Sequence, residues 1–375
     1  MSSASSALTV VPRNHMVVRM RRRPVGDILP GRDLVVVTEK APSLESVKVG
    51  EVFCKRLYLS LDPAMRGWMR NMRSYVPPVK VGAVMRGSTV NEVVESKSDR
   101  FKRGDIVLDS GMGDEGWSEY AIVNHRQLTK IDTQSLKLLP SSAYLGILGG
   151  TGLTAYFGLL KVARPIAGET LLVSGAAGAT GSVVAQIGKI LGLKVVGIAG
   201  GKKKCEWLQN TLKLDATVDY KRAENDPARF QAMLRAALRR VKSKGFDIFF
   251  DNVGGYILDE TLRRLNMRGR IVCCGAISAY NAKDPREDVR GLKNYQALIS
   301  LRARMEGFIV FDYAKEFTAA RRQLAKWIRE GLLIYEEDVR EGIISAPYAL
   351  VDLFNGKKKG KLVVKIASSN PDCRL

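Results

Sequence analysis

The feature that most constrains this 375-residue chain is a glycine-rich turn placed directly between an apolar segment and a helical one. Residues 170–174 read TLLVS, residues 175–181 read GAAGATG, and apolar residues then recur at helical spacing from about Ser182. Glycines let an anionic group approach the backbone, and the free N–H groups of a helix N-terminus attract it. This order predicts a dinucleotide-binding unit. The alternative is a tight turn without a ligand.

The end of the next predicted strand indicates which dinucleotide the turn would bind. In a site for NAD(H), an acidic residue about twenty positions further on accepts a ribose hydroxyl. Here the strand 194–199 is followed by two glycines and then by Lys202, Lys203 and Lys204. Ammonium groups suit the 2′-phosphate of NADP(H), so the sequence favours that cofactor over NAD(H). The alternative is a solvated basic turn.

Two further loops follow predicted strands. Residues 251–255 (DNVGG) come after the strand 246–250, and residues 275–281 (GAISAYN) come after the strand 270–274. In parallel α/β sheets, ligands bind beyond the carboxyl ends of the strands. We therefore expect both loops to converge on the nicotinamide half of the cofactor, although Asn252 equally suits a plain turn.

The hydrophobic pattern divides the chain into two parts. Up to about residue 135, short β segments are broken by Gly, Pro and Asp, which predicts a β-rich domain. From about residue 141, apolar strands alternate with helices, which predicts an α/β fold with a doubly wound parallel sheet. A last strand at 361–366 is far from the first part in sequence. An inserted nucleotide-binding fold would let this strand return to the β-rich domain.

Composition argues against several other classes of protein. The chain has two histidines, His15 and His125, and five cysteines without paired spacing, so we predict no metal site and a reducing compartment. The uncharged run 138–160 is long enough to cross a membrane, but its glycines argue against a membrane helix. A net charge of +22 attracts anions, yet few basic residues are interleaved with aromatic ones, so nucleic-acid binding is not expected as the main function.

These residues resemble the zinc-free medium-chain dehydrogenase/reductases, in the branch of the prostaglandin reductases (leukotriene B4 dehydrogenases) and NADP-dependent 2-alkenal reductases. The resemblance covers nearly the whole chain from about residue 13. Its most specific segments are LYLSLDPAMRGWM (57–69), GLTAYFGLL (152–160), SGAAGATGSVVAQIGK (174–189), DNVGG (251–255), CGAISAYN (274–281) and MEGFIV (305–310).

The resemblance implies a domain order and a set of cofactor ligands. A GroES-like β-rich catalytic domain would span residues 1–140 and be completed by 325–375, with a Rossmann NADP-binding domain at 141–324. The pyrophosphate would be held by Gly178, Ala179, Thr180 and Gly181, and the 2′-phosphate by Lys204 and Tyr220. The nicotinamide and its ribose would be lined by Asn252, Cys274, Gly275, Ala276, Ile277, Ser278, Ala279, Tyr280, Phe308, Ile309 and Val310.

The resemblance also implies an activity: NADPH-dependent reduction of the carbon–carbon double bond of α,β-unsaturated ketones or aldehydes. The enolate left by hydride transfer needs a hydrogen-bond donor. Tyr280 is the candidate catalytic residue, because a phenol with a pKa of about 10 is protonated at neutral pH; its alternative role is packing. Two other functions stay open, an NADPH:quinone reductase and an NADPH-binding protein that binds RNA with little turnover. The family commonly forms homodimers.

Two positions depart from the family pattern, and the C-terminal tripeptide is a separate signal. Many relatives have a tyrosine where this chain has Ala64, which predicts a roomier, less polar substrate pocket. Lys358 replaces an asparagine that reaches the cofactor, and an ammonium cannot act as an acceptor, so that role is not carried over. The chain ends in Cys373-Arg374-Leu375, similar to the Ser-Lys-Leu peroxisomal address. We expect a peroxisomal or glycosomal location, with the cytosol as the alternative.

Overall fold

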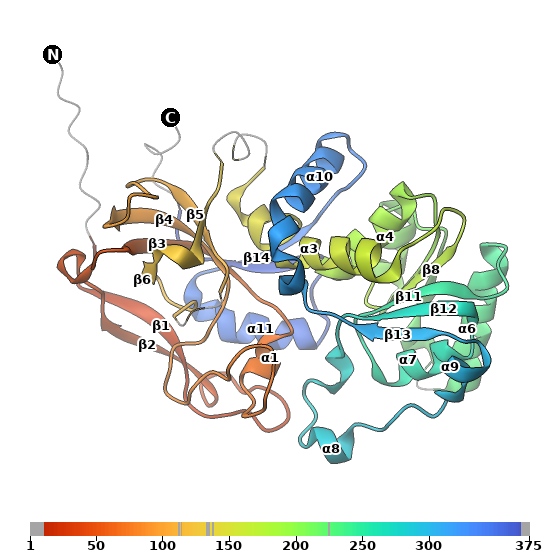
Figure 1. Ribbon diagram of the computed structural model, residues 1–375. Coiled ribbons are helices and arrows are strands. Elements are labelled where there is room, and N and C mark those ends of the chain that lie inside the picture. Colours follow the sequence, from red (N-terminus) through yellow and green to blue (C-terminus); the bar gives the residue numbers. More distant parts are fainter. Residues whose placement is uncertain are drawn as a thin grey trace.

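The computed structural model describes residues 11–111, 113, 115–132, 136, 139–223 and 226–368, which form two lobes (Figure 1). One lobe is mostly β-sheet and contains both the first and the last described residues. The other has parallel strands with helices on both faces. This confirms the predicted fold class, an α/β fold with a doubly wound sheet and a separate β-rich part.

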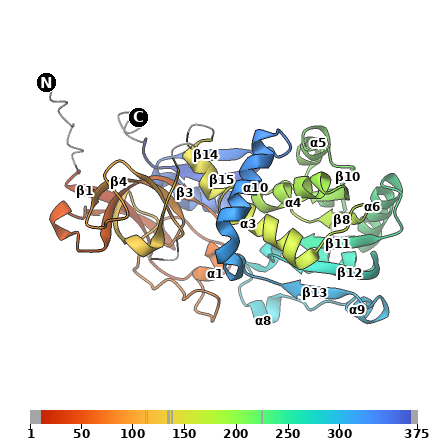
Figure 2. The same ribbon diagram turned by 45° about the horizontal axis from the view of Figure 1, so that its top comes forward.

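The nucleotide-binding lobe is built on a parallel sheet with the strand order β10-β9-β8-β11-β12-β13. Apolar strands are buried on both faces, because α3, α4 and α10 pack on one side (Figure 2) and α6 and α7 on the other (Figure 1). The strands are β8 (Thr170–Val173), β9 (Lys194–Ala199), β10 (Ala216–Asp219), β11 (Phe246–Asp251), β12 (Leu265–Cys273) and β13 (Arg304–Gly307). The helices are α3 (Gly150–Phe157), α4 (Ala179–Ile190), α5 (Lys202–Asn210), α6 (Pro227–Arg240), α7 (Gly255–Leu262), α8 (Pro285–Asp288), α9 (Gln296–Ser300) and α10 (Phe317–Arg329).

The β-rich lobe contains a sheet with the order β14-β15-β3-β4-β5-β7, in which β6 also pairs with β3, and a separate β1–β2 ribbon. Its elements are β1 (Asn14–Met20), β2 (Leu34–Lys40), β3 (Glu51–Ser60), α1 (Met65–Trp68), β4 (Thr89–Ser96), β5 (Ile106–Asp109), β6 (Tyr120–Asn124), β7 (Leu128–Lys130), β14 (Glu337–Glu341), α11 (Ala346–Phe354) and β15 (Lys361–Lys365).

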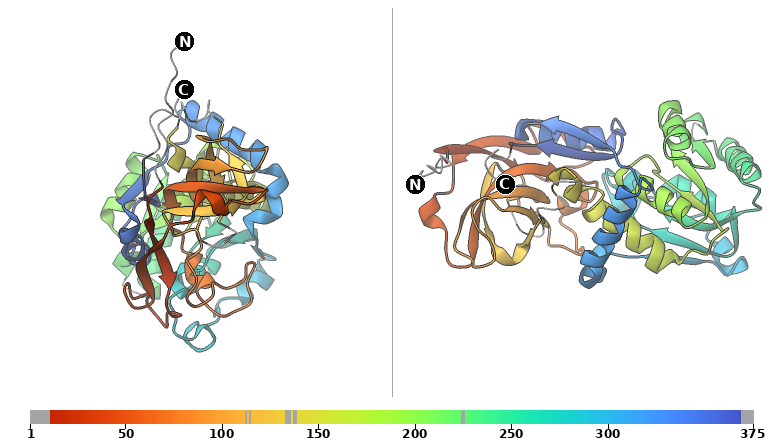
Figure 3. Two further views of the ribbon diagram at one scale, coloured as in Figure 1. Left: turned by 90° about the vertical axis from the view of Figure 1, so that its left-hand side faces the viewer. Right: turned by 90° about the horizontal axis from the view of Figure 1, so that it is seen from above.

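The C-terminal segment belongs to the same sheet as the N-terminal strands. β15 pairs antiparallel with β3, from Val363 opposite Ser60 to Lys365 opposite Tyr58, and β14 pairs parallel with β15. The helix α11 packs in the core of this lobe with residues of β1 and β3. Figure 3 shows the blue C-terminal strands beside the red and orange N-terminal ones. The nucleotide-binding lobe therefore lies between two segments of the β-rich lobe; the predicted domain limits at residues 140 and 325 stay predictions.

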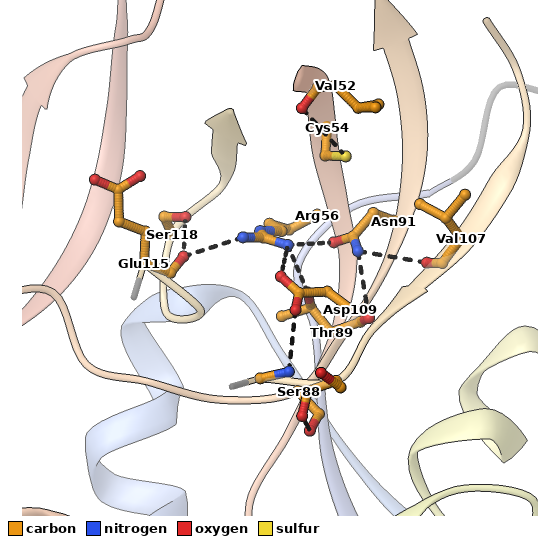
Figure 4. Close-up of polar contacts among 12 residues, drawn as sticks. Val52, Cys54, Arg56, Ser88, Thr89, Asn91, Val107, Asp109, Glu115 and Ser118 are labelled. Atoms are coloured by element: carbon orange, nitrogen blue, oxygen red, sulfur yellow. Dashed lines mark hydrogen bonds and ion pairs between the residues drawn. The ribbon is translucent and has the colours of Figure 1, made fainter. Parts of the chain in front are cut away.

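A buried arginine ties β3, β4 and β5 together (Figure 4). Arg56 is fully buried. Its Nη1 donates to Thr89 Oγ1 (2.7 Å), Asn91 Oδ1 (3.0 Å) and Asp109 Oδ2 (3.0 Å), and its Nη2 donates to the carbonyl of Glu115 (3.3 Å). A desolvated guanidinium is stable only with such partners, so this cluster fixes the relative positions of the three strands.

The uncharged run at 139–160 folds into α3 flanked by shorter helical turns rather than into one long helix. Its glycines are required by close packing, because a Cβ on Gly149 would overlap the backbone of Tyr144, and one on Gly152 would overlap the backbone of Ile147. Among the described residues, no helix has the length and apolarity needed to span a membrane.

Candidate active site

The glycine-rich turn joins β8 to α4 at the carboxyl edge of the parallel sheet. Gly175 has a φ of 58°, and a Cβ on Gly181 would overlap the carbonyl of Gly175, so turn and helix are in contact. The N–H groups of the first helical turn have no partner within the helix. Together they form a cradle that suits an anion, and it contains the predicted pyrophosphate residues Gly178, Ala179, Thr180 and Gly181.

Lys204 on α5 and Tyr220 after β10 both lie near the end of β9. A Cβ on Gly200 would lie 3.0 Å from Tyr220 Oη and 3.1 Å from Lys221 Cε. Burial, and secondly the nearby Lys221 cation, lowers the pKa of Lys204. A bound phosphate would relieve this unfavourable charge environment, so the cluster fits the 2′-phosphate of NADP(H).

An acidic residue that was not predicted from the sequence, Asp219, lies beside the cluster of Lys204, Tyr220 and Lys221. Asp219 ends β10, and its Oδ1 accepts hydrogen bonds from the N–H groups of Gly201 (2.7 Å) and Lys221 (3.2 Å). The carboxylate thereby fixes the turn after β9. The ammonium groups of this turn remain the groups suited to the 2′-phosphate.

The loop after β11 is bonded to the start of the glycine-rich turn. The carboxyl of Asp251 is buried, and burial raises its pKa. It accepts from Ser174 Oγ (2.6 Å) and from the N–H groups of Val253 (3.0 Å) and Gly254 (2.9 Å). Asn252 Nδ2 donates to the carbonyl of Ser174 (2.7 Å), which fixes the amide at the edge of the cradle.

The loop that contains Cys274 to Tyr280 packs against the preceding one. The N–H of Ile277 donates to the carbonyl of Asn252 (3.3 Å), and Ser278 donates through its N–H (3.1 Å) and Oγ (2.6 Å) to the carbonyl of Val253. The structure therefore brings together the two loops that the sequence placed at the nicotinamide. Burial raises the pKa of Cys274 to about 12, so this thiol is not an acid–base group at neutral pH.

Tyr280 turns its phenol back over its own loop. The N–H of Ala276 donates to Tyr280 Oη (3.2 Å), and this oxygen would lie 3.3 Å from a Cβ on Gly275. Burial raises the pKa of Tyr280, against a smaller lowering by the Ala276 hydrogen bond. The phenol is therefore neutral at physiological pH, with its lone pair engaged and its proton available for donation.

Phe308, Ile309 and Val310 follow β13 at the same edge of the sheet, since β13 runs parallel to β12. Phe308 and Val310 also pack against the core of the lobe, and the Phe308 ring would lie 2.6 Å from a Cβ on Gly158. Their place is compatible with contact to the nicotinamide, and that role stays a prediction.

The β-rich lobe forms hydrogen bonds with the loop that carries Tyr280. These contacts were not predicted from the sequence. Arg70 Nη2 donates to the carbonyls of Tyr280 (2.8 Å) and Ala282 (2.7 Å). Asn281 Nδ2 donates to Asp27 Oδ1 (2.8 Å). Arg70 directly follows the motif segment 57–69. Its position next to this motif is the sequence signal that could have identified Arg70 as a site residue.

A second phenol lies on the β-rich side of the site. Trp68 Nε1 donates to Tyr75 Oη (3.0 Å). Burial raises the pKa of Tyr75, and the nearby Tyr280 raises it further, against a lowering by the Trp68 hydrogen bond. Ala64, the position at which the resemblance implies a tyrosine in many relatives, directly precedes α1.

Among the described residues, no group of three or more His, Cys, Asp or Glu side chains is arranged to hold a metal ion. Instead, a parallel sheet, an anion cradle, a basic cluster and a phenol meet where the two lobes touch. Such a fold and site define a two-domain oxidoreductase that uses a nicotinamide dinucleotide.

Comparisons with known proteins identify the family. Residues 17–131 match the family "N-terminal domain of oxidoreductase", and residues 179–326 match the family "Zinc-binding dehydrogenase". A protein of Bacillus subtilis named "putative NADP-dependent oxidoreductase" is 44% identical over 93% of this chain and 97% of its own. The NADP-dependent 2-alkenal reductase of Nicotiana tabacum is 42% identical over 84% and 88%. The solved structure of CurA from Vibrio vulnificus in complex with NADPH is 35% identical, with a TM-score of 0.82 over 94% and 99%.

This chain therefore belongs to the medium-chain dehydrogenase/reductase family, in the zinc-free branch of the prostaglandin and 2-alkenal reductases. The resemblance stated from the sequence motifs is confirmed.

Proposed function

We propose that the protein is an NADPH-dependent reductase of the carbon–carbon double bond in α,β-unsaturated ketones and aldehydes. The observation that carries this proposal is the neutral phenol of Tyr280, held over the loop after β12 with its oxygen accepting the Ala276 N–H. The relationship to a 2-alkenal reductase supports the same chemistry.

The cofactor is NADP(H), and the residues present fit it. A side chain at Gly181 would collide with the carbonyl of Gly175 and disturb the cradle. Lys204 and its neighbour Lys221 supply cations suited to the 2′-phosphate. When bound, NADPH supplies the hydride that reduces the β-carbon of the substrate. The chain's own residues hold the phosphates, orient the nicotinamide and stabilise the oxygen of the substrate.

Tyr280 would donate its phenolic proton in a hydrogen bond to the carbonyl oxygen of the substrate. This oxygen gains negative charge as the enolate forms, so a donor placed there stabilises the transition state more than the ground state. Arg70 holds the backbone carbonyls of Tyr280 and Ala282, and Asp251 fixes the neighbouring loop. The site therefore has a donor and the contacts that orient it.

The test is NADPH oxidation with a medium-chain 2-alkenone, run beside NADH and beside a quinone, with the product analysed by mass spectrometry. A saturated ketone formed with NADPH and little with NADH is the expected result. Turnover on the quinone without reduction of the enone would instead support the quinone reductase. Tight RNA binding with steep salt dependence and no turnover would support the RNA-binding alternative.

We further propose a homodimer that forms through the edge of β13. Within the described residues, β13 pairs only with β12, so its other edge is free to pair with a second copy. Ile299 on α9 and Tyr295 directly before it are 73% and 53% exposed. Light scattering should give twice the chain mass, and Ile299→Glu should shift it toward the monomer; a monomeric native protein would contradict the proposal.

A peroxisomal or glycosomal location remains a proposal that rests on Cys373-Arg374-Leu375, which lie outside the described residues. A fluorescent fusion at the N-terminus should enter the organelle. The same fusion without the last three residues should stay in the cytosol. Equal distribution of the two fusions would remove the proposal.

A further inference from the structure

The segment 356–360, which leads into β15, lies against the glycine-rich turn. Gly360 forms a parallel bridge with Gly178, and its N–H donates to the carbonyl of Ala177 (3.2 Å). Lys358 extends from this segment toward the turn, with Nζ 4.0 Å from the position that a Cβ on Gly178 would take. The C-terminal segment therefore brings an ammonium group to the N-terminus of α4.

Lys358 differs from the other lysines of its segment because it has no carboxylate partner within the described residues. Its Nζ donates to the carbonyl of Gly360 (2.9 Å). Lys357 and Lys359 of the segment, and Lys361 directly after it, each form an ion pair: Lys357 with Asp352 (3.4 Å), Lys359 with Glu336, and Lys361 with Asp62 (2.6 Å). A partly buried cation without a counterion, next to an anion cradle, is the arrangement expected where a ligand supplies the negative charge.

Burial and, to a smaller extent, neighbouring cations disfavour the charge of Lys358 in the free protein. Burial, followed by repulsion from Lys361, lowers the pKa of Lys358 to about 8. The groups that face it are the cations of Lys361 and Lys204, which disfavour its charge, and the carboxylates of Asp62 and Asp338, which favour it more weakly than burial opposes it. An anion bound beside Nζ would favour the charged form.

We propose that the Lys358 ammonium is a direct ligand of the diphosphate of the bound dinucleotide. The proposal rests on the proposed function, since it needs NADP(H) in the cradle. The diphosphate would lie between the free N–H groups of α4 and Nζ, so that the helix end and the cation share its charge. Lys204 serves the 2′-phosphate, whereas Lys358 serves a group that NADP and NAD have in common.

A pH dependence of binding follows. Above about pH 8 the free protein has lost much of its Lys358 charge, while the bound protein keeps it. Binding then takes up a proton, and affinity for the dinucleotide falls as pH rises. NAD+ is the cleaner probe of this effect because it carries the diphosphate but no 2′-phosphate, which itself titrates.

The experiment measures dissociation constants of NADP+, NAD+ and 2′-AMP by calorimetry between pH 7 and 9.5, in buffers of different ionisation enthalpy. Lys358→Met should weaken NADP+ and NAD+ by the same factor, about tenfold at pH 7.5, and leave 2′-AMP unchanged. Lys358→Arg should keep the affinity and abolish proton uptake near pH 8. Lys357→Met is the matched control, since Lys357 is exposed and paired, and it should bind all three within twofold of the native protein.

The outcomes separate this proposal from the proposed function. If Lys358→Met binds NAD+ as tightly as the native protein, Lys358 is not a diphosphate ligand, while the reductase proposal stands. If only 2′-AMP and NADP+ weaken, the cation serves the 2′-phosphate and the proposal is overturned. Native protein that binds NADP+ with proton uptake but does not reduce enones would support Lys358 and contradict the reductase.

Discussion

At the level of single residues, the proton of Tyr280 is the group on which the proposed reaction depends. Its oxygen already accepts from the Ala276 N–H, so Tyr280→Phe removes one donor and leaves the loop in place. We expect turnover to fall about 100-fold, the usual effect of losing one oxyanion donor, with NADPH affinity within twofold. Steady-state kinetics and cofactor titration measure both, and unchanged turnover would exclude Tyr280 from the reaction.

The same residue predicts a pH profile. The phenol must keep its proton to donate it, and burial raises the pKa of Tyr280 above the ordinary value for a phenol. Activity at saturating NADPH should therefore stay constant from pH 7 to about 10 and decline only above this. A decline of kcat near pH 8 that persists at saturating cofactor would contradict this assignment.

Lys204 predicts the cofactor preference. Its ammonium donates to the carbonyl of Gly356 (2.7 Å) and is close enough to the Lys221 cation for its pKa to be lowered by it. Lys204→Met would remove one charge-assisted contact to the 2′-phosphate. NADPH affinity should fall about 10 to 100-fold, whereas NADH affinity should be nearly unchanged. Parallel titrations with the two cofactors provide the measurement. Equal losses for both would mean that Lys204 serves another part of the cofactor.

At the level of elements, the segment that directly follows α1 holds the loop after β12 through Arg70. Arg70→Met removes two hydrogen bonds that position Tyr280. We expect kcat to fall about tenfold, because small misplacement of a reacting group is costly, with NADPH affinity kept. Arg70→Lys should recover part of the loss, and Arg73→Met, at an exposed neighbour, should be silent. A fall in affinity alone, with kcat kept, would show that Arg70 does not position the phenol.

The buried pair that joins β3 to β5 predicts a loss of stability. Asp109→Ala leaves the Arg56 guanidinium buried without its carboxylate, which costs about 3–5 kcal/mol. Denaturant unfolding followed by circular dichroism measures this change. Glu330→Ala, which breaks an exposed pair on α10, should change stability by less than about 0.5 kcal/mol. A small effect at Asp109 would mean that the cluster relaxes or admits water.

The sequence predicted elements where periodicity was strong and missed them where it was weak. The predicted strands 170–174, 194–199 and 246–250 correspond closely to β8, β9 and β11, because buried parallel strands are continuously apolar. β10 (ATVD) is short and half polar, and α5 (KKKCEWLQN) has few apolar residues, so neither stood out from its surroundings.

At the level of the whole molecule, contacts between the lobes were beyond the reach of sequence patterns. The Gly-rich turn and the basic residues after β9 are local signals, because each can be recognised within a short stretch of sequence. Arg70 with the Tyr280 loop, and Lys358 with Gly178, join residues far apart in the chain. Such contacts depend on how the two lobes pack, which no local spacing encodes.

The pairing of β15 with β3 also bears on how the protein is made. During synthesis the strands of the nucleotide-binding lobe leave the ribosome in sequence and can pair as they appear. β3 emerges early but meets β15 only when almost the entire chain has been translated. The first lobe to be translated is therefore the last to be completed, and the edge of β3 at Tyr58–Ser60 stays unpaired until β15 emerges.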